Sequence, residues 1–177
     1  MIRPIKNESG YSLVEVMVSI MILAIAIIPM VGMFDTGLKT ATTSGNYDKA
    51  RTLANLEMEQ AKSLPFDSSD ATVQDVKDNF PEAAGTTTTY TSGAYESPSW
   101  KTVTGPASAD FTNFRYKVKK QYMTQPSQTP GSTSENFVTS TSDTYLIRVT
   151  VTVGWGAYDS GTDTYSNTYS TFGLVTG

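Results

Sequence analysis

The 177-residue sequence contains neither cysteine nor histidine. Their absence excludes disulfide bonds, thiolate and imidazole metal sites, cysteine nucleophiles and histidine general bases. Basic side chains are also scarce, with 13 Lys and Arg against 17 Asp and Glu, which gives a net charge of −4 and a pI of about 4.8. Proteins that coat DNA or RNA need surplus Lys and Arg to neutralise phosphates. The charge therefore argues against a nucleic-acid partner.

Catalytic patterns are missing as well. The sequence has no Gly-rich phosphate loop, no Ser-based triad and no positioned pair of acids. We therefore predict no enzymatic activity, no cofactor and no metal site. The segment Asp159–Asp163 offers two carboxylates that could ligate Ca²⁺, but two acids and a glycine are also typical of a polar hairpin turn, which we favour.

One long apolar run lies near the N-terminus. Residues 16–34 (VMVSIMILAIAIIPMVGMF) carry no charge. As a helix, this run would extend roughly 28 Å, close to the hydrocarbon thickness of a bilayer. A buried helix of a soluble domain is the alternative, but the remaining sequence is too polar to surround a helix that is apolar on all sides. The run therefore predicts a membrane-spanning helix.

A cleaved secretory signal peptide is a second alternative for this segment. Arg3 and Lys6 supply the basic start that such a peptide needs. However, the apolar run exceeds the usual 7–15 residues, and residues 30–34 (MVGMF) lack a small-residue cleavage site. A helical pattern also continues beyond the run. We therefore expect the helix to remain in the mature protein.

A single acid stands at the entry to the apolar run. Glu15 follows the segment SGYSLV of residues 9–14, and an unpaired carboxylate at this depth is costly enough to indicate a function. The sequence SGYSLVEV (residues 9–16), followed by the apolar run, resembles the N-terminal motif of type IV pilins and type II secretion pseudopilins. Two departures from the family pattern are Tyr11, where Phe is commonest, and Glu8 in an otherwise basic leader.

The resemblance implies a processing site and specific partners. Residues 1–10 correspond to the leader, which a membrane prepilin peptidase removes after Gly10, and Tyr11 becomes the N-methylated terminus. Residues 11–34 form the transmembrane and assembly helix, through which the protein contacts other pilin or pseudopilin subunits and the inner-membrane assembly platform. The family's major subunits often carry a C-terminal disulfide, which this cysteine-free chain cannot form, and this favours a minor or secretion-type subunit.

Charge gives this helix an orientation and a register. Arg3 and Lys6 should stay in the cytoplasm by the positive-inside rule, which places the C-terminal part outside the inner membrane. In a filament, we expect Glu15 to pair with the freed amine of Tyr11, its own or a neighbour's. The alternative is that Glu15 merely extends to the headgroups. Pro29 removes a hydrogen bond within the helix, and the sequence leaves open whether it causes a simple kink or local unwinding on assembly.

The helical pattern resumes beyond the membrane, over residues 35–65. Gly45 predicts a soft spot at residues 43–46, and Pro65 predicts the end of the helix. One face carries Tyr47, Ala50, Ala54, Met58 and Ala61, with Leu53 and Leu64 beside it; Leu56 lies off this face. Residues 50–66 resemble the helix that follows the membrane in V-type minor pilins and I-type pseudopilins.

Residues 66–177 have the pattern of a β-rich head. Residues 67–110 look irregular, with at most a turn of helix at 67–78, and residues 125–142 look like a long polar loop. Three segments alternate with period two: residues 114–122, residues 145–155 and residues 164–175, the last two joined as a hairpin. Their apolar stripes, which include Tyr145, predict a small antiparallel sheet packed on the polar half of the long helix. The fold class is therefore α+β, and it is pilin-like.

Four functions remain open. We favour a minor type IV pilin-like subunit that acts in pilus biogenesis, at initiation or at the tip. The alternatives are an I-type minor pseudopilin of type II secretion and a DNA-uptake or adhesive tip subunit. A monomeric head with the helix as a mere tether is a further possibility. DNA capture would use the basic run of Arg115, Lys117, Lys119 and Lys120, which we interpret instead as a solvated strand face.

Overall fold

The computed structural model describes residues 10–125 and 137–177 of the chain. The leader residues Arg3 and Lys6 therefore lie outside the described residues. By internal contacts the chain divides into two units, Met1–Gly45 and Asn46–Gly177. We call them the N-terminal unit and the C-terminal unit. A long N-terminal helix and an antiparallel sheet confirm the predicted α+β class.

A single helix, α1, extends over Leu13–Ser63. It ends two residues before Pro65, as predicted from the proline. Residues 43–46 are helical, so Gly45 does not interrupt α1, and the soft spot stays a prediction. A helix-interior glycine costs only about 1 kcal/mol, which is too little to interrupt a helix extended on both sides.

In the N-terminal unit, α1 exposes apolar side chains around its whole circumference. Its most apolar 18-residue window has a mean hydropathy of 2.6, and none of that window is buried. Consecutive bulky residues point about 100° apart around a helix, and Ile20, Met21 and Ile22 are each more than 60% exposed. By length and composition, this segment can cross a membrane.

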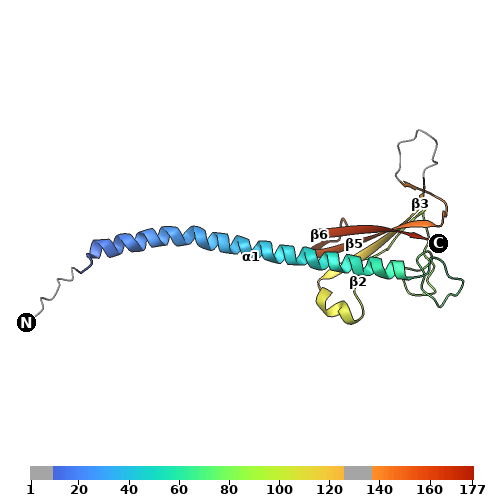
Figure 1. Cartoon of the computed structure of the whole chain (residues 1–177), viewed down its shortest axis with the longest axis horizontal. Coiled ribbons are helices and arrows are strands. Elements are labelled where there is room, and N and C mark those ends of the chain that lie inside the picture. The colour runs from blue at the N-terminus through green and yellow to red at the C-terminus, as the bar shows by residue number, and fades with distance from the viewer. Residues whose placement is uncertain (1–9, 126–136) are drawn as a thin grey trace, which may run out of the picture. The chain divides into compact units, whose positions relative to one another are not determined.

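The sheet of the C-terminal unit is built around three long strands (Figure 1). These are β3 (Phe114–Thr124), β5 (Leu146–Asp159) and β6 (Thr164–Thr176). The short strands β1 (Ala94–Glu96), β2 (Lys101–Thr102) and β4 (Val138–Thr139) all pair with β3, and a 3-10 helix, η1, covers Pro106–Phe111. The main strand order is β1-β3-β5-β6, and every pairing is antiparallel.

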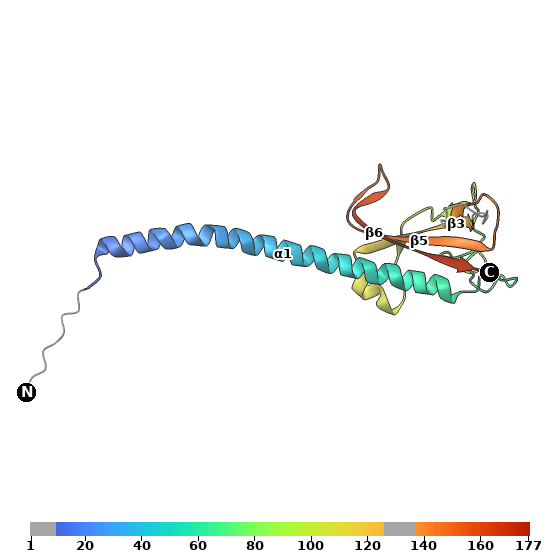
Figure 2. The same cartoon turned by 45° about the horizontal axis from the view of Figure 1, so that its top comes forward.

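The core of this unit lies between α1 and one face of the sheet (Figure 2). The helix contributes a stripe at i, i+3 and i+4 spacing, which is the pattern of a helix with one buried face. Its buried apolar members are Ala50, Leu53, Ala54, Met58 and Ala61. From the sheet come alternate residues of β3 and β5, including Val118, Val149 and Val151, all of which are fully buried. The predicted packing of helix on sheet is thus confirmed.

Three details of the C-terminal unit differ from the sequence prediction. Tyr145 does not join the buried stripe: it is 66% exposed, has a φ of 55° and precedes β5. Residues 67–78 form turns but no helix. The segment 67–110 is less irregular than expected, because β1, β2 and η1 lie within it. Strands of two or three residues are too short to show alternation, so β1 and β2 could not be predicted from it.

Candidate functional site

The start of α1 places the residues of the predicted processing site just outside the helix. Gly10 and Tyr11 are exposed and precede the first helical residue, Leu13. The backbone carbonyl of Ser12 accepts hydrogen bonds from the amides of Glu15 (3.0 Å) and Val16 (3.2 Å), which begins the helix. The peptide bond between Gly10 and Tyr11 therefore lies outside the helix, between two exposed residues.

Glu15 occupies the first turn of α1. A carboxylate is favourable there because the helix macrodipole is positive at its N-terminal end. Together with Tyr11 and apolar side chains of the next two turns, Glu15 lines a shallow groove of about 350 Å³. Within the described residues, no cation lies within 4.0 Å of its carboxylate. The acid is therefore available to a cation from elsewhere.

Pro29 lies inside α1, and the helix continues through it. Proline has no amide hydrogen, so the backbone carbonyl one turn earlier loses its usual donor. Unwinding at Pro29 concerns assembly, and it stays a prediction.

The basic run of β3 does not form the exposed stripe that DNA capture requires. Lys117 pairs with Asp163 of the β5–β6 hairpin, and Lys119 lies 3.9 Å from Glu96. Lys120 is fully buried and shares the helix-facing side of β3 with Val118 and Tyr122. The prediction that all four basic residues are solvated is thus wrong for Lys120.

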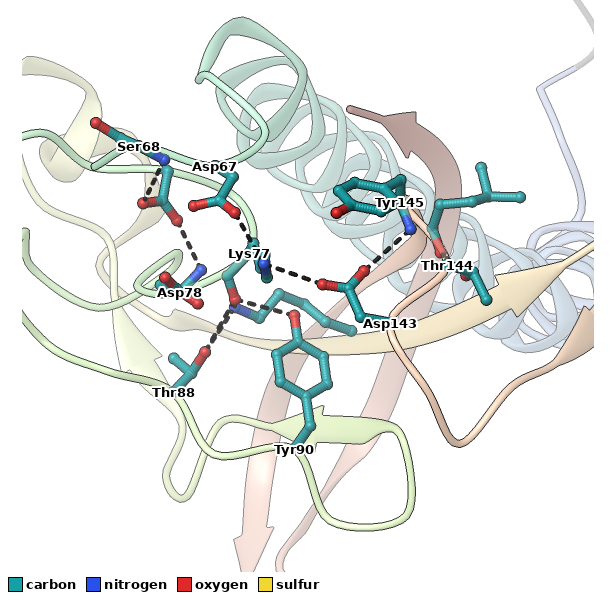
Figure 3. A network of polar contacts seen from close by, with 12 residues as sticks. Asp67, Ser68, Lys77, Asp78, Thr88, Tyr90, Asp143, Thr144 and Tyr145 are labelled. Carbon is teal, nitrogen blue, oxygen red and sulfur yellow. Dashed lines mark hydrogen bonds and ion pairs between the residues drawn. The ribbon is translucent and has the colours of Figure 1, made fainter. Parts of the chain in front are cut away.

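Lys120 joins β3 to the loop that follows α1. Its ammonium group donates hydrogen bonds to the backbone carbonyls of Val76 and Lys77, both at 2.9 Å, and to the Thr88 hydroxyl at 3.0 Å. Burial lowers the pKa of this amine to about 7, against the opposing charges of nearby acids. Figure 3 shows the surroundings, in which Thr88 and the hydroxyl of Tyr90 approach the backbone of Lys77.

Glu57 is a buried acid that the sequence patterns did not single out. It is 4% exposed and lies on the helix stripe, three residues after Ala54 and four before Ala61. Burial raises the pKa of its carboxyl group to about 7, while a hydrogen bond from the Tyr116 hydroxyl opposes the rise. The spacing alone could have revealed that Glu57 faces the sheet.

The acids of the β5–β6 hairpin have partners within the protein. The carboxylate of Asp159 accepts hydrogen bonds from the Gly161 amide and the Thr162 hydroxyl, both at 2.9 Å. That of Asp163 pairs with Lys117 and accepts a 2.7 Å hydrogen bond from Tyr158. These contacts favour a hairpin turn over a Ca²⁺ site, in line with the sequence interpretation.

Comparison with known proteins identifies the N-terminal segment. Residues 5–31 match the family model of the prokaryotic N-terminal methylation motif. This motif is the prepilin-type signal of type IV pilins and pseudopilins. No curated protein and no solved structure matches the chain. The matched residues include Gly10, Tyr11, Glu15 and Pro29, and so cover the whole predicted site.

Proposed function

We propose that this chain, which bears the prepilin-type signal of type IV pilins and pseudopilins, is a minor type IV pilin-like subunit. It acts in pilus biogenesis, at initiation or at the tip. Prepilin peptidase cleaves it after Gly10 and methylates the amine of Tyr11. It then assembles with other subunits through residues 11–34, on an inner-membrane platform. Before assembly it is a single-pass inner-membrane protein with its C-terminal unit outside.

One observation carries this proposal. The segment that matches the methylation motif is also the start of a helix with exposed apolar side chains on every side and an acid in its first turn. Apolar surface of this kind is stable only in lipid or against other apolar helices. A membrane tether would use the apolar surface alone, whereas subunit assembly also has a use for Glu15. Its charge can meet a neighbour's cationic N-terminus at low dielectric. Pro29 then provides a point at which the helix can unwind during assembly.

The experiment is mass spectrometry of the full chain extracted from membranes, with filaments sheared from the same cells. We expect the mature protein to begin at Tyr11 and to carry one methyl group. We expect Glu15→Ala to be processed normally but to fall at least tenfold in the filament fraction. Removing one partner of a buried ion pair typically costs about 3–5 kcal/mol.

Glu59→Ala is the matched control, because Glu59 is an exposed acid of the same helix. It should be processed and assembled like the unaltered protein. Retention of residues 1–10 in cells with an active peptidase would disprove the processing. Normal incorporation of Glu15→Ala would disprove the role of Glu15 in assembly, and absence of the unaltered protein from the filament fraction would leave the helix as a tether only.

A further inference from the structure

A cleft of about 620 Å³ opens in the C-terminal unit beside η1. Its floor includes Phe114 and Trp155, which are only 4% and 5% exposed. Its rim includes Lys49 from α1 and Arg115 from β3. Both views show η1 alongside the C-terminal part of α1 (Figures 1 and 2). Ligand pockets usually measure about 300–1,000 Å³ and combine an apolar base with a few polar groups, so this cleft has the size and the composition of a binding site.

The two cations of the cleft have no acidic partner. Within the described residues, no carboxylate lies within 4.0 Å of Lys49 or Arg115. Asp110, on η1, is the one acid in the lining, so the charged side chains of the cleft sum to +1. The whole chain, by contrast, carries a net charge of −4. The cleft is therefore a local positive site on an acidic protein, which favours a ligand with a negative charge.

Arg115 is held in a way that leaves one edge of its guanidinium free. Its Nη1 donates hydrogen bonds to the backbone carbonyls of Thr112 (2.9 Å) and Phe114 (2.8 Å). The opposite edge, formed by Nε and Nη2, donates to no acceptor within the described residues. Two N–H groups in one plane match the two oxygens of a carboxylate. Because its other edge is already fixed, Arg115 loses less conformational freedom when it binds such a group.

The remaining polar side chains of the cleft suit hydroxyl groups. Asn46, Thr112 and Asn113 each offer hydrogen-bond donors and acceptors, whereas the Asp110 carboxylate only accepts. Asp110 would repel a simple anion, but it can accept hydrogen bonds from the hydroxyl groups of a larger ligand. An acid in an otherwise cationic cleft therefore favours a ligand that carries several hydroxyl groups in addition to its negative charge.

A phosphate group fits this cleft less well than a carboxylate does. Phosphate carries a charge of about −1.5 to −2 at neutral pH, which exceeds the net charge of +1 on the lining. Phosphate sites also commonly use the free backbone amides at the N-terminus of a helix. The residues that η1 contributes to the lining, Ala109 and Asp110, lie instead in its C-terminal half.

From these observations we infer that the cleft binds a saccharide that carries a carboxylate group, such as a uronic acid. The free edge of Arg115 holds the carboxylate, and Lys49 adds its charge. Asp110 and Asn113 hold hydroxyl groups of the sugar, and the apolar floor receives the C–H face of a sugar ring. This binding goes beyond the proposed function and does not depend on it.

Isothermal titration calorimetry of the full chain tests the inference, in a detergent that has no sugar headgroup. The probes are trigalacturonate and sialyllactose, two saccharides whose carboxylates belong to different sugars. Their neutral counterparts are the methyl ester of trigalacturonate and lactose. We expect at least one acidic saccharide to bind at least tenfold more tightly than its neutral counterpart, because only the acid can engage Arg115 and Lys49.

Two variants test the assigned cations. Arg115→Lys keeps the charge but removes the planar fork, and Lys49→Gln removes the second cation. Each should weaken binding of the acidic saccharide about tenfold. Lys119→Gln is the matched control, because Lys119 is an exposed cation of β3 outside the cleft, and it should change the affinity less than twofold. Since Arg115 also bonds two backbone carbonyls, melting temperatures show which variants are folded, whereas Lys49 is exposed and its variant disturbs no packed side chain.

Asp110→Ala distinguishes a saccharide site from a simple anion site. The variant should bind the acidic saccharide more weakly, because the hydroxyl groups lose an acceptor. It should bind inorganic phosphate more tightly, because a repelling charge has been removed. Tighter binding of both probes would show that the cleft attracts any anion.

Four results would overturn the inference. One is the failure of both acidic saccharides to bind at millimolar concentration, and another is equal affinity for the acids and their neutral counterparts. The third is unchanged binding by both Arg115→Lys and Lys49→Gln, and the fourth is tighter binding of the saccharide by Asp110→Ala. None of these results bears on the proposed function, because cleavage after Gly10 and incorporation into filaments are measured separately.

Discussion

The ammonium group of Lys120 donates a 2.9 Å hydrogen bond to the backbone carbonyl of Val76 across the buried side of β3. This contact fastens the loop that follows α1, residues 66–85, to the sheet. It also shows how a basic residue becomes part of a core: all three ammonium hydrogens have acceptors, in Val76, Lys77 and Thr88.

Lys120→Met should destabilise the C-terminal unit by about 1–3 kcal/mol, because the carbonyl of Val76 then stays buried without this donor. Thermal unfolding of the full chain in detergent, followed by near-UV circular dichroism, measures the loss. The control is Lys119→Met, its exposed neighbour, which should cost less than about 0.5 kcal/mol. Equal effects of the two substitutions would contradict the assigned role of Lys120.

Glu57 should make stability depend on pH. Because burial raises its folded pKa to about 7 from an ordinary value of 4.5, the folded state binds more protons than the unfolded state between these values. The contribution of Glu57 to the free energy of unfolding is therefore fully present below pH 4.5, and it decreases as the pH rises to 7. The loss is roughly 3 kcal/mol, and it stays constant above pH 7.

Glu57→Gln isolates this effect, because the amide keeps the shape and does not ionise. Denaturant unfolding of both proteins should be measured at several pH values. From pH 5 to 7, the free energy of unfolding of the variant should rise relative to that of the unaltered protein. Parallel curves would show that Glu57 does not carry the dependence.

Gly93 should tolerate no side chain. Its φ is 77°, and an added Cβ would collide with the backbone carbonyl of Ser140. We expect Gly93→Ala to cost about 2 kcal/mol or more, from backbone strain and the clash together. Gly105→Ala is the control, since Gly105 has a similar φ of 89° but open space around it. The difference between their melting temperatures measures the clash, and a difference near zero would argue against it.

Calcium should leave the hairpin unchanged. The carboxylates of Asp159 and Asp163 are held by partners within the protein, so millimolar Ca²⁺ should not shift the melting temperature. Hydrogen exchange of residues 156–167 should also stay the same when a chelator is added. Calcium-dependent protection of the hairpin would revive the alternative of a metal site.

Sequence patterns predicted the elements in which the hydrophobic pattern recurs several times. The apolar run, the stripe from Ala50 to Ala61 and the alternation in β3, β5 and β6 each repeat several times, so one exception does not hide them. Tyr145 was misassigned because it continues the alternation of β5, whereas its positive φ turns it out of the strand.

Partners across the core could not be predicted in this way. Lys120 and Glu57 occupy positions that periodicity assigns to the core, but their chemistry suggested the surface. Only the pairing with distant groups, the loop carbonyls for Lys120 and the Tyr116 hydroxyl for Glu57, makes their burial possible. At the N-terminus, by contrast, the predicted site residues Gly10, Tyr11, Glu15 and Pro29 all lie within the matched motif, and their roles stay predictions.

The burial of the Lys120 amine also makes its chemical reactivity a measure of local unfolding. An acylating reagent can modify exposed lysines such as Lys49 and Lys119 in the native state, but it can reach Lys120 only after the loop around it has opened. Peptide mapping of that single acylation would therefore record how often the loop detaches, without a probe being introduced.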